Sequence, residues 1–350
     1  MKNTKLKKLL AVFSTLAVLT VSLYGCSSSA NKASTASDNG GNLFEIEAYG
    51  VVDPQISAQQ IIADKKGFFK EEGLKVTNKL LQSGGDISPL ISGNTAKVSF
   101  ESTYTDIALA ANNVDVKILA TMANIGDTQC VVAGKNVTIN SAKDIEGKKI
   151  GIASGAGVLI AIRNMCKDLG VDINKIQFVI LSPSEQISAL ERGDIDIMAC
   201  WEPWVTNALD TGGKLLFSGL HSYLPEKTGS VDWLNFHTTL QVTGDFLKNN
   251  PKQAEALLKA LAKATDYINK NPEESAKIIA TELNLDSNKV QKIMAKNVYT
   301  MKFDKSFVDS SNVMAQFMNE TGNIKSVPKF DSYADYTPLK NALPELVTVD

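Results

Sequence analysis

Histidine and cysteine are scarce in this chain of 350 residues, which contains two histidines and four cysteines. A metal centre built on imidazole or on several thiolates needs more of these ligands, grouped at short spacings. The spacings typical of common catalysts are missing too: there is no Gly-x-Ser-x-Gly, no phosphate-binding loop and no His-Glu-x-x-His. We therefore expect no metal, no cofactor and no enzymatic activity.

An excess of charge of either sign is also lacking. The 36 Lys and Arg residues nearly balance the 38 Asp and Glu residues, and no basic stripe is interleaved with aromatic residues. This balance argues against a nucleic-acid partner. With 44% hydrophobic and 21% charged residues, the composition is typical of a globular protein. The length is sufficient for about two domains.

The N-terminal segment has the pattern of a secretory signal. Four lysines precede an apolar run over residues 9–23, which at about 15 residues is short for a membrane-spanning helix of about 20. The run ends in Leu23-Tyr24-Gly25-Cys26, which resembles a bacterial lipobox, although Tyr24 is bulkier than usual. We expect a signal peptide over 1–26, a lipid on Cys26 and a flexible tether over 27–41 rich in Ser, Ala, Asn, Gly and Thr.

This pattern predicts a cell-membrane protein, lipid-anchored on the extracytoplasmic face. A plain secretory signal with a chance cysteine is the alternative. The remaining cysteines, Cys130, Cys166 and Cys200, are odd in number and lie in apolar contexts. Buried free thiols are therefore expected, and one disulfide with one thiol left over is the alternative.

Strand and helix patterns alternate over the first 245 residues, which predicts an α/β fold with parallel, two-faced sheets. The pattern between about 128 and 245 indicates a second, smaller α/β unit, and from Asn250 the chain reads as helical. Ser184 is expected to cap the helix that ends near Gly193. The expected strands are 43–52, 75–81, 98–100, 116–122, 129–133, 149–153, 177–181, 195–200, 214–217 and 237–242.

One strand end carries two tryptophans and a carboxylate. Pro203 has no N–H to donate, so the strand over 195–200 stops there and leaves Trp201-Glu202-Pro203-Trp204 at its carboxyl end. Ligands of open α/β sheets bind at such ends, and aromatic walls with one charge suit a small ionic or amphiphilic solute. Glu202 would pair with a cationic ligand group or lock the lobes together. Trp233 is a further candidate, whereas His237 is expected to be structural.

Glycine-containing loops follow other strands. Ser154-Gly155-Ala156-Gly157 lies between a strand and a helix but lacks the third glycine and the acid of a dinucleotide fingerprint. Its N–H groups suit an anion, with a simple tight turn as the alternative. Ser83 and Gly84 form a weaker version of the same pattern. Glu101 and Ser102 follow a strand, so they face the cleft unless Glu101 is a solvated loop charge.

Several segments together resemble the extracytoplasmic solute-binding lipoproteins of ABC importers, in the nitrate/sulfonate/taurine (NMT1/THI5-like) group. The resemblance covers about 42–300 and rests on 63–74, 150–158, 189–204 and 246–271. It implies a two-lobe periplasmic-binding-protein type II fold with C-terminal helices packed on lobe one. Lobe one would comprise 42–127 and 246–350, and lobe two 128–245. The implied partners are a small-molecule solute and the permease and ATPase subunits, with a monomeric binding protein.

The resemblance also implies which residues lie near the ligand. Four acids among them would crowd a pure anion, which favours an aminosulfonate such as taurine over nitrate. An alkanesulfonate fits the group as well. The alternatives are a thiamine-precursor pyrimidine or another nitrogen heterocycle, an enzyme on the same fold, and a sensor or adhesion lipoprotein. The implied ligand-binding residues are Val52, Asp53, Ser83, Gly84, Glu101, Ser102, Asp127, Thr128, Ser154, Gly155, Ala156, Trp201 and Glu202.

Overall fold

A computed structural model describes residues 42–349, apart from 82–83 and 154–155. These described residues belong to one compact unit. The expected signal peptide, the lipidation site Cys26 and the tether lie outside the described residues. Within the described part, no helix is both long enough and apolar enough to cross a membrane.

The first sheet has six strands in the order β13-β4-β12-β3-β1-β2. β1 pairs in parallel with both β2 and β3, and β12 lies antiparallel between β3 and β4. Its strands are β1 (Phe44–Val51), β2 (Leu74–Leu81), β3 (Val98–Ser102), β4 (Val116–Asn124), β12 (His237–Thr243) and β13 (Val298–Tyr299).

The second sheet has seven strands in the order β11-β10-β9-β5-β8-β6-β7. β6 pairs in parallel with β7 and β8, whereas β5 is antiparallel to both of its neighbours. Its strands are β5 (Gln129–Ala133), β6 (Lys149–Ile152), β7 (Gln177–Ile180), β8 (Ile197–Trp201), β9 (Lys214–Ser218), β10 (His221–Ser222) and β11 (Gly229–Ser230).

Two expectations about the sheets are wrong. Both sheets are mixed, not parallel, and the strand over 237–242 belongs to the first sheet and not to the second unit. The reason is the path of the chain: β5 enters the second sheet and β12 returns to the first, and each runs against its neighbours. Strand–helix alternation does not reveal such crossings, because it reports local periodicity and not pairing partners.

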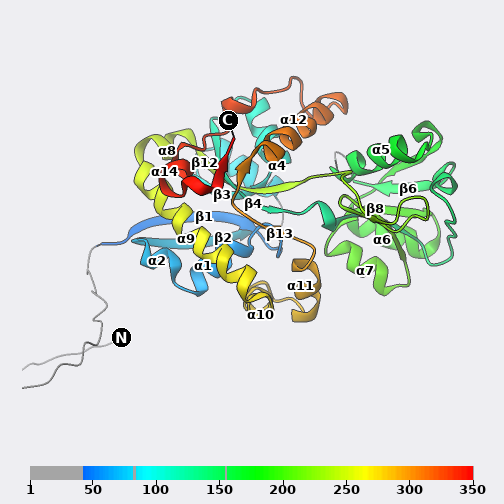
Figure 1. The fold of residues 1–350 in the computed structure, drawn as a ribbon, viewed down its shortest axis with the longest axis horizontal. Coiled ribbons are helices and arrows are strands. Elements are labelled where there is room, and N and C mark those ends of the chain that lie inside the picture. Colours follow the sequence, from blue (N-terminus) through cyan, green and yellow to red (C-terminus); the bar gives the residue numbers. More distant parts are fainter. Residues whose placement is uncertain (1–41, 82–83, 154–155, 350) are drawn as a thin grey trace, which may run out of the picture. The chain divides into compact units, whose positions relative to one another are not determined.

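Helices cover both sheets, as Figure 1 shows. α5 (Val158–Leu169), α6 (Pro183–Arg192) and α7 (Trp204–Asp210) surround the second sheet. The remaining helices lie around the first sheet: α1 (Ala58–Lys65), α2 (Phe68–Glu71), α3 (Gly84–Ser92), α4 (Thr103–Ala111), α8 (Gly244–Asn249), α9 (Pro251–Lys270), α10 (Pro272–Leu283), α11 (Ser287–Met294), α12 (Lys305–Glu320), α13 (Phe330–Tyr333) and α14 (Thr337–Ala342). A short parallel pair, β14 (Phe303–Asp304) and β15 (Val347–Thr348), lies near the C-terminus.

The C-terminal helices pack on the first sheet, as expected. Helix α9 begins at Pro251, and its residues Ala254, Leu257, Leu258 and Leu261 form one fully buried face. This helix contacts α1, α2, α14 and β2. The burial of its apolar face explains why the C-terminal third of the chain packs on the first sheet.

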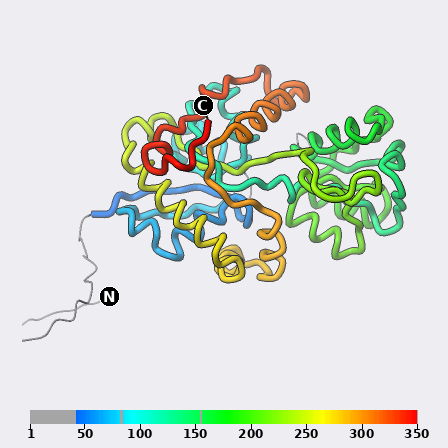
Figure 2. Tube along the Cα trace, in the orientation of Figure 1, coloured from blue at the N-terminus to red at the C-terminus, as the bar shows by residue number. Residues whose placement is uncertain are grey.

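Two chain segments cross between the sheets, one after β4 and one before β12. They lie side by side, because Ile125 N donates to Phe236 O at 2.7 Å and Asn124 Nδ2 donates to Asn235 Oδ1, also at 2.7 Å. In Figure 2 they are the teal and the yellow-green segments of the tube that join the two sheets. The cleft residues described below flank this double connection.

The prediction of buried free thiols is confirmed for Cys130, Cys166 and Cys200. Cys130 and Cys200 are fully buried and stand directly opposite each other on β5 and β8. Burial raises the pKa of the Cys200 thiol to about 12. Both thiols belong to an apolar cluster between the second sheet and helices α6 and α7.

The N-terminus of α6 differs from the expectation by two residues. The helix begins at Pro183 and its cap is Ser182, not Ser184. The N–H and the hydroxyl of Ser182 both donate to Glu185 Oε2, at 2.8 and 2.6 Å. Pro183 at the first helical position explains the shift, because a proline there costs no hydrogen bond. The C-terminus is as expected, with Gly193 in the left-handed region at φ 79°.

Replacing Ser182 by Ala should lower the free energy of unfolding by about 1 kcal/mol, because the helix loses its capping side chain. Ser184→Ala is the matched control and should change it by less than about 0.5 kcal/mol. Urea denaturation followed by circular dichroism gives both values. Equal effects of the two changes would place the cap elsewhere.

Candidate functional site

A cavity of about 530 Å³ lies where the two sheets meet. Strand ends and helix starts from both sheets line it, and aromatic side chains form much of its wall. No lysine, arginine or histidine is among the lining residues that the structure describes. The described lining residues are Val51, Val52, Asp53, Gln55, Ile56, Gly84, Gly85, Ser102, Tyr104, Ile125, Gln129, Ala156, Gly157, Trp201, Glu202, Pro203, Trp204 and Phe236.

Three helices of eight or more residues start at this cavity. Gly84 and Gly85 open α3, Ser102 precedes α4, and Gly157 precedes α5. The first N–H groups of a helix have no partner within the helix, and its N-terminus carries a partial positive charge. The short helix α7 adds a fourth start at Pro203 and Trp204. Within the described lining, positive charge therefore comes from the backbone of helix starts and not from cationic side chains.

Asp53 is the carboxylate of the cavity that retains a free oxygen. Its Oδ1 accepts hydrogen bonds from Gln55 N at 2.6 Å and Ile56 N at 2.9 Å. Among the described residues, none donates to Oδ2. Burial raises the pKa of Asp53 to about 6, although the two N–H donors oppose this shift. Asp53 is thus ionised at neutral pH and can accept a hydrogen bond from a ligand.

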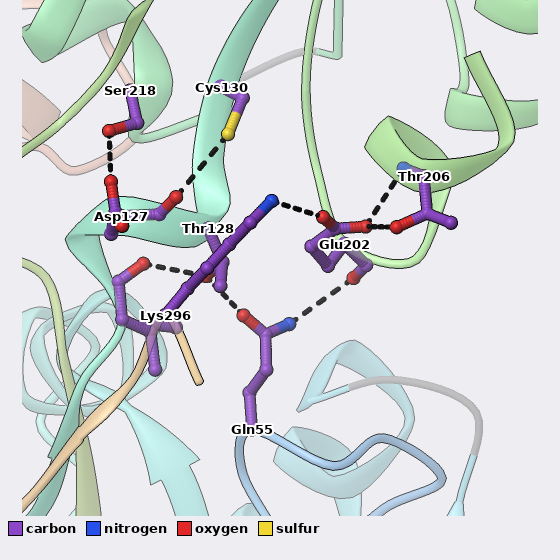
Figure 3. Close-up of polar contacts among 9 residues, drawn as sticks. Gln55, Asp127, Thr128, Cys130, Glu202, Thr206, Ser218 and Lys296 are labelled. Carbon is purple, nitrogen blue, oxygen red and sulfur yellow. Dashed lines mark hydrogen bonds and ion pairs between the residues drawn. The ribbon is translucent and has the colours of Figure 1, made fainter. Parts of the chain in front are cut away.

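Glu202, in contrast, is fully engaged by the protein (Figure 3). The residue is 1% exposed. Its Oε1 accepts from Lys296 Nζ at 2.8 Å, and its Oε2 accepts from Thr206 N at 2.9 Å and Thr206 Oγ1 at 2.7 Å. Of the two roles expected for Glu202, the contacts favour the lock over the pairing with a ligand cation.

Lys296 reaches Glu202 from the segment that follows α11. Burial alone would lower the pKa of Lys296, but the nearby Cys130, Glu202 and Asp127 raise it overall. A second ion pair joins the same region to α7, between Lys289 Nζ and Asp210 Oδ2 at 2.8 Å. That pair is exposed at both ends, whereas the Lys296–Glu202 pair is largely buried. Removing one partner from the buried pair is therefore expected to cost more than breaking the exposed pair.

Gln55 also bridges the two sides of the cavity (Figure 3). Its Nε2 donates to the backbone oxygen of Glu202 at 3.2 Å, and its Oε1 accepts from the Thr128 hydroxyl. Asp127 accepts a hydrogen bond from the Ser218 hydroxyl. Neither Asp127 nor Thr128 lines the cavity. These two residues support the strand connection and the Gln55 bridge.

Glu101 does not face the cavity, contrary to the expectation, and it is not a solvated charge either. It is fully buried at the end of β3, and its neighbour Ser102 is the residue that lines the cavity. Successive side chains of a strand point to opposite faces, so one of the two had to turn away. Burial, followed by the nearby Asp106, raises the pKa of Glu101 well above its usual range.

The structure thus brings seven of the expected residues to the cavity: Val52, Asp53, Gly84, Ser102, Ala156, Trp201 and Glu202. Ser83, Ser154 and Gly155 lie outside the described residues. Of the four acids expected around the ligand, Asp53 and Glu202 line the cavity in the described part of the chain, whereas Glu101 and Asp127 do not. Whether any of the expected residues binds a ligand stays a prediction.

Trp233, the further candidate from the sequence, does not line the cavity, and neither does His237, which is expected to be structural. Trp233 is buried, and its Nε1 donates to Asp168 Oδ2 at 2.9 Å. Burial lowers the pKa of His237 to about 4, and its ring packs on Phe307. Sequence reasoning missed Gln55, Tyr104, Phe236 and Lys296, which carry no local motif and gain their places only through contacts distant in sequence.

The chain belongs to the NMT1/THI5-like family, whose model matches residues 56–275. One relative is named as an aliphatic sulfonates-binding protein of Bacillus subtilis and is 26% identical over 81% of this chain and 85% of its own length. The taurine-binding periplasmic protein of Escherichia coli is 24% identical over 84% and 92%. A 4-amino-5-hydroxymethyl-2-methylpyrimidine phosphate synthase of Aspergillus parasiticus is 24% identical over 79% and 80%.

Solved structures show the same fold. The periplasmic sulfonate-binding protein SsuA of Methylobacillus flagellatus has a TM-score of 0.72 at 18% identity, covering 88% of this chain and 98% of that one. The periplasmic nitrate-binding protein NrtA of Synechocystis has a TM-score of 0.66 at 14% identity, covering 87% and 89%. The desulfurization enzyme DSZB has a TM-score of 0.63 at 14% identity, covering 86% and 99%. The expected fold, the two-lobe type II fold of periplasmic binding proteins, is confirmed.

Replacing Lys296 tests how much the buried ion pair with Glu202 matters for the free energy of unfolding. Lys296→Met should lower the free energy of unfolding by roughly 3 kcal/mol, because it leaves the Glu202 carboxylate buried without its counter-charge. Lys289→Met breaks the exposed pair and should cost less than about 1 kcal/mol. Chemical denaturation of both variants supplies the comparison. Similar losses in the two variants would mean that the Lys296–Glu202 pair behaves as a surface pair.

Proposed function

We propose that this protein is the extracytoplasmic solute-binding component of an ABC importer and that its ligand is a small organosulfonate. The observation that carries the proposal is the convergence of the starts of α3, α4 and α5 on a cavity without cationic side chains. Backbone N–H groups can bind the three oxygens of a sulfonate from several directions. The sulfonate-binding and taurine-binding relatives support this choice.

The walls of the cavity favour an organic anion over nitrate. Trp201, Trp204, Tyr104 and Phe236 line it. Aromatic surface of this kind buries an alkyl or aryl group favourably but offers nothing to an inorganic ion. A volume of about 530 Å³ also exceeds what a bare inorganic anion fills. The ligand therefore has an anionic end at the helix starts and a carbon body against the aromatic wall.

Asp53 gives the site a means of selecting an amine. Its free Oδ2 in the cavity is the acceptor that a ligand ammonium group needs, and Glu202 is already paired with Lys296. Taurine combines a sulfonate and an ammonium group, whereas 1-propanesulfonate has nearly the same shape and carries a methyl group in place of the ammonium. Comparing these two ligands isolates the contribution of Asp53.

The affinity for taurine should rise with pH up to about 6, the pKa of Asp53. Below that pH the carboxyl is protonated and accepts an ammonium poorly, so the affinity falls by up to about tenfold per pH unit. The affinity for 1-propanesulfonate should not rise over the same range. Titration calorimetry at pH 4.5 to 7.5 measures both ligands.

Asp53→Asn is the variant for this comparison, and it should weaken taurine by about tenfold or more while flattening its pH profile. Glu202→Gln serves as the counterpart, because we expect its effect to be the same for both ligands. If Glu202→Gln weakened taurine selectively and Asp53→Asn did not, the amine would lie at Glu202. If neither ligand bound at any pH, the sulfonate assignment would fail.

A pyrimidine is the second candidate, supported by the similarity to a pyrimidine phosphate synthase and by indole rings on which a heterocycle can stack. Adding hydroxymethylpyrimidine to the titrations tests it.

We propose a binding role and not catalysis, with lipidation of Cys26 holding the protein at the extracytoplasmic face of the cell membrane. The lobes would be 42–127 with 246–350, and 128–245 apart from β12, acting as a monomer beside the permease and ATPase subunits.

A further inference from the structure

A pair of buried acids lies beneath the start of helix α3. Glu101 and Asp106 are both fully buried. Neither oxygen of Glu101 makes a hydrogen bond of normal geometry with a described residue, although the Thr105 hydroxyl lies near enough to oppose part of the rise in the pKa of Glu101. Asp106 Oδ1 has no hydrogen-bond partner among the described residues either. Asp106 Oδ2 accepts from the Thr239 hydroxyl at 2.6 Å. A buried carboxylate without partners is costly to ionise, so this pair needs a physical explanation.

The Glu101 carboxyl lies directly against the cavity lining. A Cβ placed on Gly84 would come within 2.6 Å of Glu101 Oε2 and 3.0 Å of Thr105 Oγ1. Gly84 opens α3 and lines the cavity. The carboxyl therefore touches the backbone of the helix start that we assign to the anionic end of the ligand. Only a glycine at this position allows so close an approach.

No cation in the described surroundings compensates a charge on Glu101. Burial keeps His237 neutral above a pKa of about 4, and the other titratable groups are acids or phenols. Burial also raises the pKa of Asp106, to about 8, and Asp106 in turn raises that of Glu101. The titratable groups on the elements packed around Glu101 are Glu45, Glu47 and Tyr49 of β1, Asp86 of α3, Tyr104 and Asp106 of α4, His237 of β12 and Tyr333 of α13.

We propose that Glu101 holds a proton beneath the anion-binding end of the cavity, and that this proton and the bound anion stabilise each other. With the proton in place, the floor of the site is neutral and the N–H groups of α3 attract the anion without an opposing charge on Glu101. Without it, a negative charge lies beside the same N–H groups and repels the ligand. The coupling rests on the proposed anion site, whereas the presence of the proton does not.

The sign of the pH dependence follows from linkage. The anion favours the protonated form, so the pKa of Glu101 is higher in the complex than in the free protein. Affinity is then highest below the raised pKa of Glu101 in the free protein and falls as pH rises through it. Asp106 ionises on the same alkaline side and adds to the fall. This fall in affinity with pH is opposite in direction to the pH dependence that Asp53 sets for taurine.

The proton itself is tested on the full-length protein without ligand. The infrared spectrum at pH 7 should contain the carbonyl band of a buried carboxylic acid, and Glu101→Gln should remove part of it. Asp106→Asn should remove a separate part, which assigns the two groups. Glu45→Gln, an exposed acid on the same sheet, should leave the band unchanged. A wild-type spectrum identical to that of Glu101→Gln would overturn the proposal.

The coupling is tested with 1-propanesulfonate, which has no group that titrates between pH 6 and 10. Wild-type protein and Glu45→Gln should bind it about tenfold or more weakly at the alkaline end. Binding there should take up protons, as calorimetry in buffers of different ionisation enthalpy reports. The dissociation constant of Glu101→Gln should vary much less over the range. A wild-type profile that is flat and takes up no protons would refute the coupling.

The two possible failures can be told apart. If the infrared band assigns a proton to Glu101 but no sulfonate binds at any pH, the proton stands and the sulfonate function is wrong. If sulfonates bind and the band is absent, the function stands and the proton is wrong. Should Glu101→Gln fold poorly, Asp106→Asn provides the second measurement, because it removes the charge that raises the pKa of Glu101 and should shift the alkaline fall in affinity to lower pH.

Discussion

The buried carboxylate of Glu202 is the constraint on which the rest of the site depends. A charge at this depth must be compensated, and the compensation comes from three directions: the Lys296 ammonium, the Thr206 hydroxyl and the start of α7. Because Lys296 follows α11, this requirement holds the end of α11 against the second sheet. In the sequence, Glu202 lies between Trp201 and Pro203. Holding the Glu202 carboxylate in place therefore also fixes this part of the aromatic wall.

The electrostatics of the cavity depend on the charged groups that are not already paired within the protein. With Glu202 neutralised and Glu101 turned into the interior, the remaining negative group is Asp53, and the positive potential comes from helix starts. A site of this kind binds the anionic end of a ligand at the helix starts and a cationic end at Asp53. Long basic side chains would reach across such a small cavity, whereas backbone donors remain where the fold places them.

Much of this could be predicted from the sequence, because the carboxyl ends of strands gather at one edge of a sheet. Ser102 and Trp201 are expected at the cavity on that basis, Asp53 is expected there from the family resemblance, and local chemistry alone identifies Gly193 as a helix end. The partners of Glu202 could not be found in this way. Lys296 is 94 residues distant and Gln55 is 147 residues distant, and no local pattern marks either one. The antiparallel placement of β12 and the inward turn of Glu101 depend likewise on pairing and strand phase.

The burial of the three cysteines has a practical consequence. Cys130 and Cys200 are fully buried and Cys166 is 3% exposed, so a thiol-alkylating reagent reaches them only when the surrounding structure opens. Cys130 and Cys200 sit in the small cluster beside α6 and α7, whereas Cys166 belongs to the main core beside α5. The time course of alkylation at Cys130 or Cys200 therefore reports the opening of one part of the molecule, and that at Cys166 reports the opening of another, without any introduced label.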